Sequence, residues 1–184
     1  MKKILLPILL AASFSANAAI TNGGFETGDL TGWTCGGADY CISSTADSHT
    51  GTYSMQGFDN TGFATLSQSF ATAIGSTYDL EFWSRAYSVN AGNILRYDIS
   101  GSTSSVSTTT DWLLTQSSFV ASSALTSLSF LFETNSGTGT WFIDDVSVGL
   151  SDVSQVPVPA ALFMFAPALL GFMGLRRKAK NSVA

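Results

Sequence analysis

The placement of the charged residues divides this sequence into three parts. Six of the eight Lys and Arg residues lie within the first three or the last nine positions, whereas all 13 Asp and Glu residues lie between Glu26 and Asp152. Residues 19–155 therefore carry 13 acids and two bases, Arg85 and Arg96, which gives a net charge of −11. Because phosphate binding requires clustered Lys and Arg, we do not expect this middle part to bind nucleic acid.

The N-terminal part has the layout of a secretory signal peptide. Lys2 and Lys3 precede an apolar run over 4–12, and small residues at Ala16 and Ala18 form a cleavage site. We expect residues 1–18 to be removed after Ala18 and the protein to be exported. An uncleaved membrane anchor is the alternative, and the short apolar run disfavours it.

The C-terminal part predicts a transmembrane helix over 160–175, because this stretch is nearly unbroken in its apolar character and is followed by Arg and Lys residues. Such a helix spans roughly 24 Å, whereas the hydrocarbon core of a bilayer is about 30 Å thick. Local thinning of the bilayer can compensate for this difference. The basic tail 176–184 is then cytoplasmic, and the acidic middle faces outward. A helix in the core of the middle domain is disfavoured, because the stretch is apolar on every side.

A proline motif stands before the apolar stretch, in the linker 151–159. Together with the apolar helix and the basic end it resembles a PEP-CTERM sorting signal, on Val156, Pro157, Pro159, Arg176 and Arg177. Val158 stands where the common form of the motif has Glu. The resemblance implies an exosortase and the secretion machinery as partners. It also implies a transient inner-membrane anchor facing the periplasm, and a final location at the cell surface or outside the cell.

The middle part is predicted to be all-β. Ser and Thr make up 44 of the residues in 19–155, which disfavours helix and favours strands and turns. Strands are expected at 52–58, 64–70, 77–87, 93–100, 112–120, 125–134 and 140–148, of which 77–87 alternates most clearly with period two. Residues 100–110 are expected to form a loop or a ragged hairpin. This pattern predicts an antiparallel β-sandwich over residues 19–150.

Three stretches of the middle part resemble the landmarks of galactose-binding-like jelly rolls, a group that includes many carbohydrate-binding modules. They are residues 22–33, 49–54 and 141–146. The resemblance implies a jelly-roll fold and makes exopolysaccharide a candidate partner.

A polar strand face carries the candidate sugar-binding residues Trp83, Arg85 and Tyr87. Aromatic rings offer flat apolar surfaces to sugars, and charged groups can bind sugar hydroxyls. Arg96 and Asp98 are expected on the adjacent strand and the same face. The alternative is ordinary packing at a sheet edge, or a cation–π contact of Arg85 with its neighbours.

The jelly-roll resemblance also implies a structural Ca²⁺. Its ligands would be the side chains of Glu26, Asp144 and Asp145 and backbone oxygens of Thr50 and Gly51, because Ca²⁺ prefers hard oxygen ligands. The alternative is that these acids are solvated turn residues or strand-end caps.

The only two cysteines, Cys35 and Cys41, are expected to form a disulfide in an oxidising compartment. A thiol pair for metal or redox chemistry is the alternative, and the spacing and the lack of partner histidines disfavour it. His49 is the only histidine, so neither a catalytic triad nor a zinc site can be assembled around it, and we expect it to be a surface turn residue.

The leading hypothesis is a non-enzymatic, exported protein of the cell surface, extracellular matrix or biofilm, with carbohydrate as its candidate ligand. Two alternatives stay open. One is a secreted polysaccharide hydrolase on the same scaffold, although nothing selects two of the acids as a catalytic pair. The other is a purely structural surface protein without a specific ligand.

Overall fold

The computed structural model describes residues 19–37, 40–59, 62–89, 92–133 and 139–151. These residues form ten strands: β1 (Thr34–Gly36), β2 (Tyr40–Ser44), β3 (Ser54–Phe58), β4 (Ala64–Ala71), β5 (Thr77–Ala86), β6 (Ile94–Ile99), β7 (Ser102–Val106), β8 (Leu113–Val120), β9 (Leu125–Glu133) and β10 (Trp141–Leu150). The predicted signal peptide, sorting motif, apolar helix and basic tail lie outside the described residues. Within the described ranges, no helix is long and apolar enough to cross a membrane.

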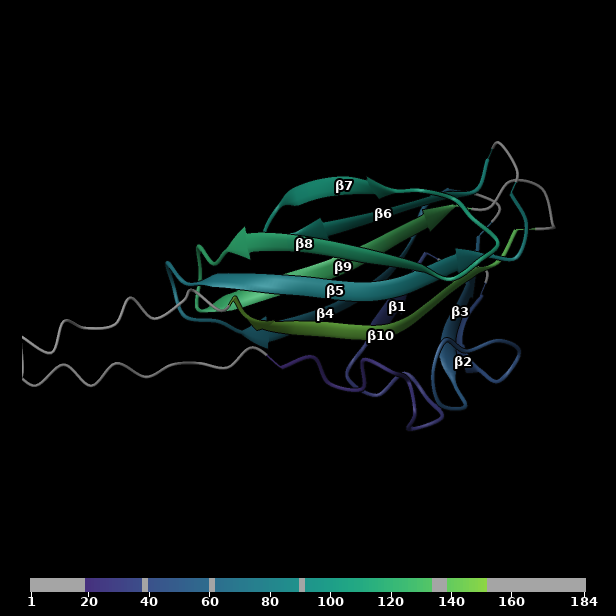
Figure 1. Ribbon diagram of the computed structural model, residues 1–184, viewed down its shortest axis with the longest axis horizontal. Coiled ribbons are helices and arrows are strands. Elements are labelled where there is room, and N and C mark those ends of the chain that lie inside the picture. The colour runs from purple at the N-terminus through teal and green to yellow at the C-terminus, as the bar shows by residue number, and fades with distance from the viewer. Residues whose placement is uncertain (1–18, 38–39, 60–61, 90–91, 134–138, 152–184) are drawn as a thin grey trace, which may run out of the picture. The chain divides into compact units, whose positions relative to one another are not determined.

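The strands form two five-stranded antiparallel sheets. Sheet A has the order β1-β4-β9-β6-β7, and sheet B has the order β2-β3-β10-β5-β8. In Figure 1, β5 lies between β8 and β10, as the strand order requires. The predicted antiparallel β-sandwich is thereby confirmed for the described residues.

The inner faces of the two sheets form the core through period-two alternation. In β5 the side chains of Tyr78, Leu80 and Phe82 are fully buried, and the residues between them point outward. Phe82 packs edge-to-face on Phe130 of the opposite sheet, with ring centroids 4.9 Å apart, the arrangement that aromatic quadrupoles favour. The alternation of apolar and polar residues that predicted this strand therefore matches the alternation of buried and outward side chains along it.

The segment 102–106 is a strand, so the hairpin alternative for 100–110 is confirmed there. Ser100 and Gly101 connect β6 to β7 with φ angles of 54° and 80°, the left-handed conformations that suit a two-residue hairpin turn. However, β6 lies in sheet A and does not neighbour β5. The expectation that Arg96 and Asp98 share a face with the candidate sugar residues is therefore wrong.

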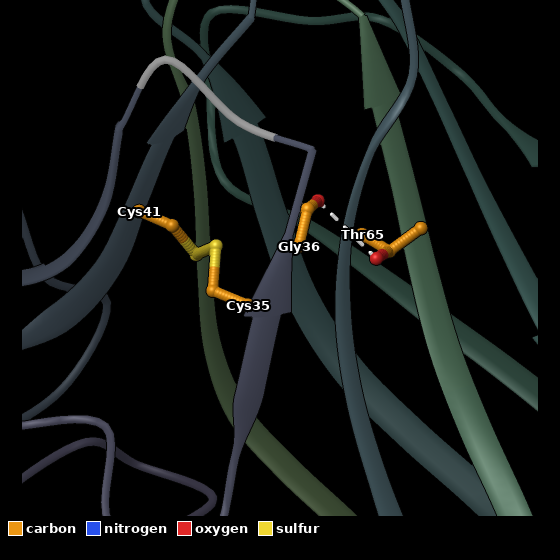
Figure 2. The surroundings of a disulfide bond; sticks show 4 residues. All are labelled: Cys35, Gly36, Cys41 and Thr65. Atoms are coloured by element: carbon orange, nitrogen blue, oxygen red, sulfur yellow. Dashed lines mark hydrogen bonds between the residues drawn. A yellow bond between two sulfur atoms is a disulfide. The ribbon is translucent and has the colours of Figure 1, made fainter.

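The predicted disulfide joins the two sheets at one side of the sandwich. Cys35 lies on β1 of sheet A and Cys41 on β2 of sheet B, with Cα atoms 6.2 Å apart. Figure 2 shows the bridge beside the hydrogen bond that the Thr65 hydroxyl donates to the Gly36 carbonyl, at 3.3 Å. Neither β1 nor β2 was predicted from the sequence, and the bridge fixes both short strands at this edge.

Candidate functional site

A bulge in β10 presents two consecutive acidic side chains to the loop between β2 and β3. The register between β10 and β5 shifts between Asp144 and Ser147, and Asp145 has a φ angle of 50°. A bulge re-aims side chains that would otherwise alternate across the sheet. Asp144 and Asp145 can therefore both bond to the loop at His49 and Thr50.

Asp144 is fully buried. One of its carboxylate oxygens accepts hydrogen bonds from the backbone N–H of His49 at 2.8 Å and of Thr50 at 3.2 Å. The other accepts from the N–H of Asp145 at 2.7 Å. Burial raises the pKa of Asp144 from 3.8 to about 6, although these backbone donors oppose the shift. The fold thus holds a carboxylate where its negative charge is costly.

Two more carboxylates bond to the same loop. Asp145 accepts a hydrogen bond from the Thr50 hydroxyl at 2.7 Å, and Glu26 accepts from the backbone N–H groups of Thr52 at 2.9 Å and Tyr53 at 2.8 Å. Gly24 lies among all three acids. A Cβ atom there would lie 3.7 Å from an oxygen of Asp145, 3.8 Å from Cγ of Glu26 and 3.9 Å from an oxygen of Asp144.

The structure therefore brings the five predicted calcium residues together, but with a different bonding pattern. The backbone of Thr50 presents its N–H to Asp144, and the Gly51 carbonyl accepts a bond from the Ser48 hydroxyl at 3.4 Å. Among the described residues, no three side chains of His, Cys, Asp or Glu are arranged as a ready metal site. The chemistry of the set still fits Ca²⁺, because its acceptors are hard oxygens and no Lys or Arg of the described part pairs with the three acids.

His49 packs into this site and is not a simple surface turn residue. Its ring lies parallel to that of Trp83, with centroids 3.8 Å apart and planes 15° apart. Trp112 meets it edge-on, with centroids 5.7 Å apart. Nδ1 of the imidazole is 2.7 Å from a carboxylate oxygen of Asp145. His49 thus connects the carboxylates to the aromatic side chains of sheet B.

A pocket of about 350 Å³ lies on the outer face of sheet B. Gln56 of β3, Arg85 of β5, Tyr87 directly after β5, and Phe142 of β10 line it, and the loop contributes Asp47. The Tyr87 side chain is 67% exposed, so an aromatic ring is available at the rim of the pocket.

A cation fixed by its neighbours forms one wall of the pocket. Arg85 Nη1 forms an ion pair with the Asp47 carboxylate, and the guanidinium carbon lies 5.8 Å from the centroid of the Phe142 ring. Asp47 also accepts a hydrogen bond from Trp112 Nε1 at 3.4 Å. Among the described residues, the buried Nε of Arg85 has no hydrogen-bond partner. The pocket therefore combines aromatic surface with a polar donor.

Two of the three predicted sugar residues, Arg85 and Tyr87, line the pocket, whereas the ring of Trp83 stacks on His49. Sequence reasoning missed Gln56, Asp47 and Phe142 as lining residues. For Phe142 a signal was present, because it alternates with the core residues on either side of it in a predicted strand. No local pattern marked Asp47.

A family model described as a carbohydrate binding domain matches residues 17–143. The solved structure of TmCBM61 in complex with β-1,4-galactotriose is 22% identical, covers 70% of this chain and 95% of its own, and has a TM-score of 0.60. The CBM22-1 xylan-binding domain from Paenibacillus barcinonensis Xyn10C is 17% identical, covers 75% and 97%, and has a TM-score of 0.56.

One further structural likeness lies within a larger protein. The enzymatically active domain of Bacteriophage CBA120 tailspike protein 4 is 16% identical, with 72% of this chain and 21% of that chain covered and a TM-score of 0.56. No curated protein matches the sequence. The structural likenesses establish the jelly-roll type of fold.

Proposed function

The chain belongs to the carbohydrate binding domain family, and from this premise we propose that it is an exported, non-enzymatic protein that binds polysaccharide in the pocket of sheet B. The observation that carries the proposal is the composition of this pocket. The exposed Tyr87 ring and the amide of Gln56 line it together with the ion-paired Arg85, whose guanidinium lies over the buried Phe142 ring. Sugar recognition needs this combination, because rings stack on the apolar faces of sugars and polar groups bind their hydroxyls.

The test is binding of the purified chain to soluble polysaccharides, measured by affinity electrophoresis and calorimetry. The panel includes β-1,4-galactan, xylan and an exopolysaccharide preparation. Tyr87→Ala should weaken binding to the recognised polymer by roughly tenfold or more, which is the value of one stacking contact. Val89→Ala is the matched control, because Val89 is 59% exposed and lies outside the pocket lining.

Two outcomes contradict the proposal. If no polysaccharide of the panel binds, the binding proposal is wrong, and the alternative of a structural surface protein is favoured. If reducing sugar is released from a bound polymer, the chain is a hydrolase and the non-enzymatic part of the proposal is wrong.

We also propose that the carboxylates of Glu26, Asp144 and Asp145 hold a structural Ca²⁺. The support is their convergence near Gly24 and the burial of Asp144 without a cationic partner among the described residues. A bound dication would supply the missing positive charge and would offset part of the repulsion in a domain of net charge −11. Addition of Ca²⁺ after chelation should raise the melting temperature, and an unchanged melting temperature would contradict the metal site.

We propose in addition that the protein is exported and sorted to the cell surface. The sequence features at both ends support an exported protein that an exosortase processes and that ends at the cell surface or in the matrix. Deletion of residues 156–184 should move the protein to the soluble periplasm or the medium. Membrane retention of the truncated chain would contradict the sorting signal.

A further inference from the structure

The two lateral sides of the sandwich are built differently. On one side the edge strands are the short β1 and β2, and the Cys35–Cys41 bridge joins them. On the other side the edge strands are β7 and β8. β8 pairs with β5 along all eight of its residues without a register shift. β8 lies beside β5 in Figure 1, and no described residue pairs with the edge of β8 that faces away from β5.

β8 lacks the features that usually block pairing at an exposed edge. Its sequence, Leu-Leu-Thr-Gln-Ser-Ser-Phe-Val, contains no charged residue and no proline. Natural edge strands are commonly protected by Lys, Pro, bulges or short length. An eight-residue uncharged edge is therefore suited to pair with another strand.

The backbone direction shows which groups are free to pair. The N–H of Ala121 donates to the Ser76 carbonyl, on the β5 side, at 2.9 Å. Backbone groups alternate sides along an antiparallel strand. It follows from the β5–β8 register that four residues direct their N–H and C=O groups away from β5: Leu114, Gln116, Ser118 and Val120.

The side chains of this edge are neutral, and two of them bond to the acids that lie beside them on β5. Gln116 donates to the carboxylate of Glu81 at 2.5 Å, and the Ser118 hydroxyl donates to the carboxylate of Asp79 at 2.6 Å. The two nearest acids are thus bonded within the sheet. Leu114 and Val120 stand at either end of the strand and are 37% and 59% exposed.

We propose that β8 is an assembly edge at which a second copy of this chain pairs antiparallel, around a two-fold axis through Ser117. In this register Leu114 lies opposite Val120 of the second copy, and Gln116 lies opposite Ser118. Apolar residues then meet apolar residues and neutral polar residues meet each other, which stabilises cross-strand pairs. A two-fold axis one residue away, at Gln116 or at Ser118, would place Leu114 opposite a serine. The sequence of β8 is therefore self-complementary in one register, and pairing joins the two B sheets into one.

The occupant is a second copy because the uncharged sequence of β8 is complementary to itself in this register. Elsewhere on their surfaces, two domains of net charge −11 repel each other. β8 is a strand along which two copies can approach without opposing any charged side chain. Pairing also satisfies the free N–H and C=O groups of both copies at once.

The register is tested by cysteine cross-linking of the full chain in mild detergent. Ser117 would lie opposite itself, in a non-hydrogen-bonded pair with Cα atoms about 4.5 Å apart, which a disulfide can bridge. Ser117→Cys should therefore give a covalent dimer under mild oxidation. Thr115→Cys is the matched control, because its two copies would be offset by about four residues, or roughly 13 Å, and should not cross-link. Equal cross-linking of both variants would overturn the register.

The contribution of the edge is tested by sedimentation velocity of the full chain. Gln116→Pro removes an N–H that faces the free edge and leaves the β5 ladder intact, so it should raise the dimer dissociation constant roughly tenfold or more. Gln116→Ala removes the same side chain and keeps the N–H, so it should remain dimeric. A native chain that is monomeric at every concentration, or a dimer that Gln116→Pro leaves unchanged, would overturn the proposal.

A charge pair keeps the test decisive if the proline variant fails to fold. Leu114→Lys combined with Val120→Lys places like charges opposite each other and should abolish the dimer. Leu114→Lys combined with Val120→Glu places opposite charges there and should restore it. Identical behaviour of the two double variants would contradict the pairing of these positions.

Discussion

The imidazole of His49 lies parallel to the indole of Trp83, with ring centroids 3.8 Å apart. The same imidazole bonds to Asp145 through Nδ1 at 2.7 Å. One side chain in the loop between β2 and β3 is therefore attached both to an outward residue of β5 and to the bulge of β10. Through His49 the loop that contributes Asp47 to the pocket is fixed to the carboxylate site.

His49→Ala should loosen this loop. The substitution removes the ring stack and the contact with Asp145, so we expect the free energy of unfolding to fall by about 1 to 2 kcal/mol. His49→Phe keeps an aromatic ring over Trp83 and removes only the polar contact, so its free energy of unfolding should fall less than that of His49→Ala. Chemical denaturation measures both, and a loss in His49→Phe as large as in His49→Ala would show that the stack contributes nothing.

Asp144 should make the domain less stable as the pH rises through the range from about 4 to 6 in the presence of a chelator. The pKa of Asp144 is about 6 in the folded state, against 3.8 when unperturbed. Because the folded pKa is the higher one, the folded state binds the proton more tightly. The contribution of protonated Asp144 to the free energy of unfolding is therefore fully present below pH 3.8 and is lost as the pH rises through 6. The total loss is about 3 kcal/mol.

The contribution of Asp144 is isolated by comparison with Asp144→Asn. The difference in unfolding free energy between the native chain and this variant should change with pH in that range, because all other titrating groups are shared. Saturating Ca²⁺ should reduce the dependence, because a bound cation compensates the carboxylate. A difference that is constant between pH 4 and 7 would contradict the assignment to Asp144.

Gly23 occupies a position that excludes any side chain. A Cβ atom there would lie 1.9 Å from the backbone oxygen of Val146, and the Gly23 carbonyl accepts the N–H of Val146 at 3.0 Å. Gly23→Ala must therefore displace the backbone beside the bulge, and we expect a loss of about 3 kcal/mol or more. Gly149→Ala, on the same strand as Val146, is the control, because nothing lies within 4 Å of its added Cβ, and it should change the melting temperature little.

The Cys35–Cys41 bridge should contribute modestly to stability. On the chain-entropy account a loop this short yields about 2 kcal/mol, and replacement of both residues by Ser should lower the free energy of unfolding by that amount. The exported protein should show no free thiol in a denaturing thiol assay. Two reactive thiols, or an unchanged stability of the double variant, would contradict the role of the bridge between the sheets.

The sequence predicted those elements whose signal is local. Burial alternates along β5 in the order that its sequence alternates, so its face assignment was confirmed. β1 is three residues long, which is too short to show the alternation of apolar and polar residues that predicts a strand. The sheet that holds Arg96 depends on the strand order, which is not local. The jelly-roll resemblance placed Thr50 and Gly51 beside Asp145, but no local pattern indicated that the His49 ring stacks on Trp83.

Arg85 should contribute to polysaccharide binding through its planar guanidinium. Its guanidinium pairs with Asp47 through Nη1 and lies over the Phe142 ring, and its Nε has no partner among the described residues. A lysine can replace the charge but cannot supply the planar guanidinium that bonds to Asp47 and lies over the Phe142 ring. Arg85→Lys should therefore weaken polysaccharide binding roughly tenfold, measured by calorimetry with the polymer that the native chain recognises. Val89→Ala again serves as the control, and native affinity in Arg85→Lys would show that only the positive charge at this position matters.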